Sequence, residues 1–64
     1  MLDKPLSTTE RHNAFDMLRG CCNRICVTDD PKELINLIGS AHYYVNLLAQ
    51  SRILQLSEEV SSDE

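Results

Sequence analysis

Several features that mark common classes of protein are missing from this sequence. No run of residues approaches the roughly 20 apolar positions of a membrane-spanning helix, and the opening MLDKPLSTTE lacks the apolar core of a signal peptide. There is no glycine-rich phosphate loop, no paired metal-binding motif, and no nucleophile beside a base and an orienting acid. We therefore expect a cytoplasmic protein that is not an enzyme and binds no cofactor.

An excess of positive charge is missing as well. The chain has ten acidic and six basic residues, which gives a net charge of −4. Four of the acidic residues lie in the final segment SEEVSSDE, so residues 1–56 are neutral overall. A basic surface is the usual mark of a nucleic-acid-binding protein, so nucleic acid is not the expected partner. We interpret residues 57–64 as an acidic, disordered tail.

The first periodic segment predicts a helix over residues 8–26. Ser7 and Glu10 have the spacing of a capping box, which pairs backbone N–H groups that the first helical turn leaves free. Behind them, apolar residues recur every three or four positions, as on one face of a helix; they are Phe15, Leu18, Cys22 and Ile25.

A clear turn signal follows at residues 27–30. Asp30 is a candidate N-cap, Pro31 suits the first helical position, and Glu33 has the spacing of a second capping box. The second helix is predicted over residues 31–56. Because the connection is short, the fold class we expect is all-α, an antiparallel two-helix hairpin in a single domain of 64 residues.

The second helix has more apolar surface than the first can cover. Its expected length is about 39 Å, against about 28 Å for the first helix. A chain of this size buries only about 60 % of its unfolded surface, so it gains from a partner. We expect a homodimer that forms a four-helix bundle; the predicted core and dimer interface comprises Phe15, Leu18, Cys22, Ile25, Leu34, Ile38, Ala41, Val45 and Leu48.

The segment GSAHYY, residues 39–44, suggests further contacts. Gly39 weakens a helix, so we expect a close helix crossing at the small residues 39–41. Tyr43 points away from the predicted core, and tyrosine is common at protein interfaces. A line of Tyr43, Leu47 and Leu54 is therefore the expected exposed surface for a partner protein.

Three cysteines, Cys21, Cys22 and Cys26, fall within six positions of one another. Neighbouring cysteines in a helix do not suit a disulfide, and zinc needs about four ligands. The additional donors His12 and His42 stand alone on their helices, and His12 is about 15 Å from Cys22. We therefore expect no metal site, and thiols that mainly fill the helix interface. A thiol or metal sensor remains the minor alternative.

In length and organisation, residues 7–56 resemble the plasmid copy-number regulator Rop, as an architecture without an aligned motif. The hairpin, the Asp-containing turn near residue 30 and the acidic tail carry this likeness. The resemblance implies RNA binding through one helix face, for which the first helix offers Arg11, Arg19 and Arg24 near Phe15. Our main hypothesis is instead a bacterial or phage accessory protein that regulates by binding itself and a partner protein.

Overall fold

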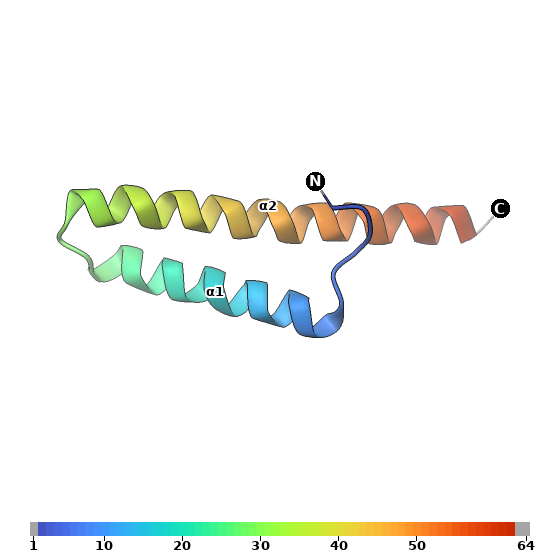
Figure 1. Ribbon diagram of the computed structural model, residues 1–64, viewed down its shortest axis with the longest axis horizontal. Coiled ribbons are helices and arrows are strands. Elements are labelled where there is room, and N and C mark those ends of the chain that lie inside the picture. The colour runs from blue at the N-terminus through green and yellow to red at the C-terminus, as the bar shows by residue number, and fades with distance from the viewer. Residues whose placement is uncertain (1, 63–64) are drawn as a thin grey trace.

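The chain folds into two antiparallel helices, seen in a computed structural model that describes residues 2–62, with side chains through residue 58 (Figure 1). Helix α1 spans Thr8–Val27 and helix α2 spans Pro31–Ser62. The described residues contain no strand. The predicted all-α hairpin is confirmed, and it forms a rod of 52 × 18 × 15 Å.

The start of α1 is the capping box that the sequence predicts. The Ser7 hydroxyl accepts from the Glu10 N–H at 3.1 Å, and the Glu10 carboxylate accepts from the Ser7 N–H at 3.0 Å. The hydrogen bond from the Ser7 backbone is the main reason that the pKa of Glu10 lies below its ordinary value. The helix ends at Val27, one residue beyond the prediction, where the Thr28 N–H donates to the Arg24 carbonyl oxygen.

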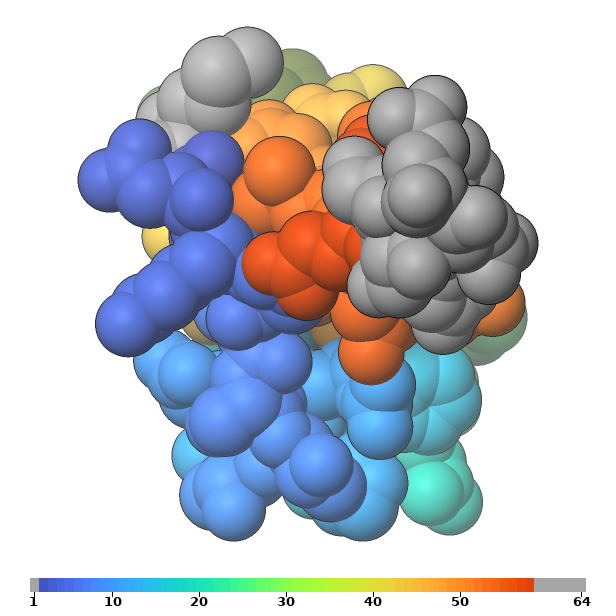
Figure 2. All heavy atoms as spheres, turned by 90° about the vertical axis from the view of Figure 1, so that its right-hand side faces the viewer, coloured from blue at the N-terminus to red at the C-terminus, as the bar shows by residue number. Residues whose placement is uncertain are grey.

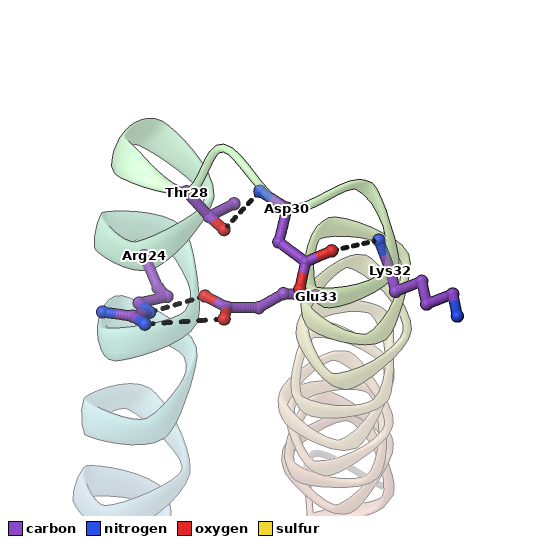
Figure 3. Close-up of polar contacts among 5 residues, drawn as sticks. All are labelled: Arg24, Thr28, Asp30, Lys32 and Glu33. Carbon is purple, nitrogen blue, oxygen red and sulfur yellow. Dashed lines mark hydrogen bonds and ion pairs between the residues drawn. The ribbon is translucent and has the colours of Figure 1, made fainter.

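The turn differs from the prediction at one residue, Glu33 (Figure 3). Asp30 caps α2 by accepting from the Lys32 N–H at 3.0 Å, but its own N–H donates to the Thr28 hydroxyl at 3.2 Å. The N–H that a second capping box requires is therefore already paired, and the prediction of that box is wrong.

Glu33 reaches across the seam instead. Its carboxylate oxygens lie 2.7 and 3.5 Å from two guanidinium nitrogens of Arg24. A charged donor is a stronger partner for a carboxylate than a backbone amide. The Arg24 hydrogen bond lowers the pKa of Glu33, and the same bond raises the pKa of Arg24. The pair ties the two helices together beside the turn.

Helix α2 is longer than predicted. It continues to Ser62 rather than ending at residue 56, so the expected disordered tail is helical over residues 57–62; residues 63–64 lie outside the described part. The segment after Leu56 contains no proline or glycine to stop the helix. With 32 residues against 20, α2 is about 48 Å long and α1 about 30 Å. Its last turns extend beyond α1 (Figure 1).

The seam between the helices has regular spacings of three and four residues. The buried and half-buried positions that form it are Arg11, Ala14, Leu18, Cys21 and Ile25 on α1, and Leu34, Leu37, Ala41, Tyr44, Leu48 and Ser51 on α2. Among the side chains that the structure describes, only Ala14 and Ser51 are buried, and no large one is fully buried. The hairpin therefore has a thin core for a folded domain.

The predicted stripe on α1 is half right. Leu18 and Ile25 lie in the seam, but Phe15 and Cys22 are exposed while their neighbours Ala14 and Cys21 face α2. Neighbouring residues on a helix point about 100° apart, so both choices satisfy the same periodicity. The small Ala14 lets the helices approach at a level where Phe15 would hold them apart.

Gly39 does not mark a close helix crossing. It is exposed, and a Cβ added there would meet nothing within 4 Å. The expectation based on the small residues 39–41 is therefore wrong for Gly39 within the hairpin, where this residue weakens the helix without a packing contact.

The substitution Gly39→Ala is expected to stabilise the fold by about 1 kcal/mol, because alanine has the higher helix propensity. For a domain of this size that corresponds to a rise in Tm of about 4–8 °C, measured by circular dichroism. Gly20→Ala is the matched control, since its added Cβ also meets nothing. If Gly20→Ala stabilises the fold while Gly39→Ala destabilises it, the result would support a close helix crossing at Gly39, which the structure does not show.

Candidate interaction face

A strap formed by residues 2–6 crosses α2 on one side of the hairpin (Figure 1). The Leu2 N–H donates to the Gln50 side-chain oxygen at 3.2 Å, and the Leu6 N–H donates to the Ser51 hydroxyl at 3.0 Å. In the end-on view of Figure 2, the strap (blue) packs against the orange part of α2. Ser51 is buried in the seam, so this hydrogen bond also pairs a hydroxyl that would otherwise lose water.

The strap changes the surface expected for a partner protein. Leu47 and Leu54 are half-buried beside Leu2, and only Tyr43 of the three predicted residues is exposed. The prediction that Leu47 and Leu54 form an exposed line is therefore wrong. The pattern of either helix gave no signal for this cover, because the strap precedes the first helix in the chain.

Open cavities remain beneath the strap. The larger, of 370 Å³, is lined by Leu2, Tyr43, Asn46, Leu47 and Gln50. A smaller one of 150 Å³ is lined by Leu2, Gln50, Ile53 and Leu54. The lining of these two cavities contains no nucleophile beside a base. The rings of Tyr43 and Tyr44 are in edge-to-face contact, with their centroids 5.1 Å apart. This contact holds the Tyr43 ring at the edge of the larger cavity.

On the opposite side of the hairpin, no described residue forms such a cover. Here α2 presents a second stripe with spacings of three and four, formed by Ile35, Ile38, His42, Val45, Ala49, Arg52 and Leu56, all of them exposed. Ile35 is 69 % exposed and Val45 47 %. Helix α1 adds Phe15, which is 54 % exposed, and Cys22.

The two helices contribute to this surface from the same side. In an antiparallel pair, residues of the two helices that flank the seam on the same side lie next to one another on one surface. The Arg24–Glu33 pair marks one flank, which is also the flank on which Leu47 lies beside Leu6 of the strap. The other flank therefore gathers apolar residues of both helices on one side, with His42 and Arg52 among them. We call this side the outer face; its apolar residues are Phe15, Cys22, Ile35, Ile38, Val45 and Leu56.

The outer face divides the predicted interface into two sets. Leu18, Ile25, Leu34, Ala41 and Leu48 lie half-buried in the seam, within the hairpin itself. The other four predicted residues lie on the outer face; they are Phe15, Cys22, Ile38 and Val45. The periodicity of the sequence does not distinguish these two stripes, one of which lies in the seam and the other on the outer face.

The cysteines also divide between the two surfaces. Cys21 is half-buried in the seam, whereas Cys22 and Cys26 are exposed, and all three are free thiols. The expectation that Cys22 fills the helix interface within the hairpin is wrong; Cys21 does so. Within residues 2–62, no group of three or more potential ligands is placed to hold a metal ion.

The three arginines considered for nucleic acid do not form a common surface. Arg11 is half-buried toward the seam, and Arg24 is paired with Glu33. Arg19 alone is exposed without such an ion pair among the described residues. Arg11 and Arg24 are also about 20 Å apart along the helix.

The hairpin exposes more surface than a folded protein of its mass normally does. Its accessible surface is 5142 Å². A monomeric protein of 7.3 kDa is expected to expose about 4,200 Å². The excess of about 900 Å² is close to the roughly 800 Å² that each partner buries in a standard protein interface.

Comparisons with known proteins give no family for this chain. No protein-family model matches it, and neither the curated proteins nor the solved structures contain a significant match. Neither described helix is long and apolar enough to cross a membrane.

Proposed function

We propose that the chain is a small non-enzymatic interaction module that acts by helix-mediated binding, to a second copy of itself and to a partner protein. The observation that carries the proposal is the excess of exposed surface, together with the apolar outer face on the side that the strap leaves open. Large apolar side chains exposed together on one side of a small protein are typical of a binding site.

The thin core supports self-association in particular. With Ala14 as the one buried apolar residue among those described, the seam contributes little of the hydrophobic stabilisation that a domain needs. A second copy seated on the outer face would bury Phe15 and Val45, and four helices would then share one core. In such a dimer, folding and association are one process.

A partner protein has a separate surface available at the strap. Tyr43 is exposed there beside a cavity that Leu2 and Leu47 line. An amphipathic ring next to an apolar cavity is a common anchor in protein interfaces. RNA binding is less favoured, because Arg11 is half-buried and Arg24 is paired with Glu33. A thiol sensor is less favoured, because no group of potential metal ligands forms among the described residues.

Sedimentation equilibrium over a dilution series tests the proposal. We expect a species of twice the 7.3 kDa chain mass at micromolar concentration, and helical content that falls as the dimer dissociates. A fully helical, stable monomer at nanomolar concentration would contradict it, since the outer face would then need no partner.

A further inference from the structure

We infer that the second copy lies antiparallel, with α2 against α2 along the whole stripe, Val45 beside the two-fold axis and the turns at opposite ends. The inference rests on the self-association proposed above and adds the arrangement of the two copies. It follows from the symmetry of the stripe, the unequal lengths of the helices and the area that a stable interface requires.

The stripe on α2 is centred on Val45. Ile38 and Arg52 lie seven residues before and after it, and the apolar ends Ile35 and Leu56 lie ten and eleven residues away. A two-fold interface is isologous. If one residue of the first copy contacts a second residue of the other copy, the same two residues also make contact with the copies exchanged. Turning one copy end over end about Val45 lays the stripe on itself and brings Ile35 to Leu56. It also sets Ile38 against the aliphatic stem of Arg52, whose charged end stays in solvent at the rim.

The overhang of α2 selects this arrangement over the one with both turns at the same end. Leu6, just before α1, is bonded to Ser51, so α2 beyond that level has no α1 beside it. With the turns together, each α2 would lie on the shorter α1 of the other copy, and Leu56 would stay uncovered. The antiparallel arrangement places the first turns of the other α2 over this residue.

The available area leads to the same conclusion. The side of the rod measures 52 × 18 Å, so one face offers at most roughly 900 Å². A standard interface uses about 800 Å² per partner. A stable dimer therefore needs almost the full length of the face. An arrangement that leaves the overhang of α2 uncovered does not use that length.

Spin-label distances distinguish the two arrangements. Asp29→Cys, in a chain carrying Cys21→Ala, Cys22→Ala and Cys26→Ala, places one label at each turn. Asp29 is sixteen residues from Val45, about 24 Å, so electron–electron resonance is expected to give about 45–50 Å between copies. With the turns together, the labels would lie within about 25 Å, the width of two helices.

Asn46→Cys in the same background is the control. Its label lies next to the level of the axis, so it reports a short distance in either arrangement and shows whether a dimer is present. No distance from Asn46, with a monomeric mass, would mean that the proposed function fails. A short Asn46 distance with a short Asp29 distance would overturn the antiparallel arrangement alone.

A measurement on the unmodified chain covers the case in which the cysteine-free background does not fold. In a dimer of isotope-labelled and unlabelled copies, filtered NMR spectra are expected to show contacts from the Leu56 methyl groups of one copy to Ile35 of the other. If Leu56 shows no contact with the other copy in a sample of dimeric mass, the inference is overturned.

Discussion

The double substitution Ile38→Asp and Val45→Asp is expected to abolish self-association. Both residues lie on the outer face, and neither contributes to the seam. An uncompensated charge buried in an interface costs about 3–5 kcal/mol, and each 1.4 kcal/mol is about a factor of ten in the dissociation constant. The dissociation constant should rise at least about a hundredfold, measured by sedimentation equilibrium.

The matched control is Asn46→Asp with Ile53→Asp. It adds the same two negative charges to α2, but on the strap side, where Ile53 is 62 % exposed. This variant is expected to keep its dimeric mass. If the control dissociates as strongly as the test variant, general charge repulsion rather than the outer face explains the effect. A test variant that remains dimeric would remove the outer face from the proposed function.

Local chemistry made parts of this fold predictable. The capping box of Ser7 and Glu10 depends on residues three positions apart, and it forms as the sequence indicates. Pro31 likewise begins α2 where its fixed geometry is favourable. Each of these features is decided by neighbours in the chain, so the sequence contains the information needed.

Features that depend on distant residues were not predictable in this way. Glu33 has the spacing of a capping box, but Arg24, from the other helix, takes its carboxylate. The strap is held by a hydrogen bond between Leu6 and Ser51, which are 45 positions apart. Helical periodicity carries no sign of either contact, because both arise only when the hairpin has closed.

The division of apolar residues into seam and outer face was the largest gap. Apolar residues occur side by side at Ala14 and Phe15 and again at Leu37 and Ile38, so two stripes run along each helix. A periodic pattern identifies that such stripes exist, but the width of the seam decides which one faces the other helix. The small Ala14 and the half-buried Leu37 make that choice here, and they leave the larger neighbours outside.

The double substitution Leu47→Asn and Leu54→Asn is expected to lower the free energy of unfolding by about 2–3 kcal/mol. Full burial of a leucine contributes about 1.5–3 kcal/mol, and both residues are half-buried, with Leu2 of the strap beside them. For a domain of this size the change corresponds to a fall in Tm of roughly 10–20 °C. Chemical denaturation at fixed protein concentration measures it.

Tyr43→Ser separates this structural role from partner binding. Tyr43 is exposed at the edge of the same cavity, so its loss is expected to change stability by less than about 0.5 kcal/mol. If the leucine variant is as stable as the unmodified chain, the strap does not hold these side chains, and the line of three residues is a free surface after all. If it unfolds readily while Tyr43→Ser does not, the leucines belong to the fold, and Tyr43 is left as the proposed contact for a partner protein.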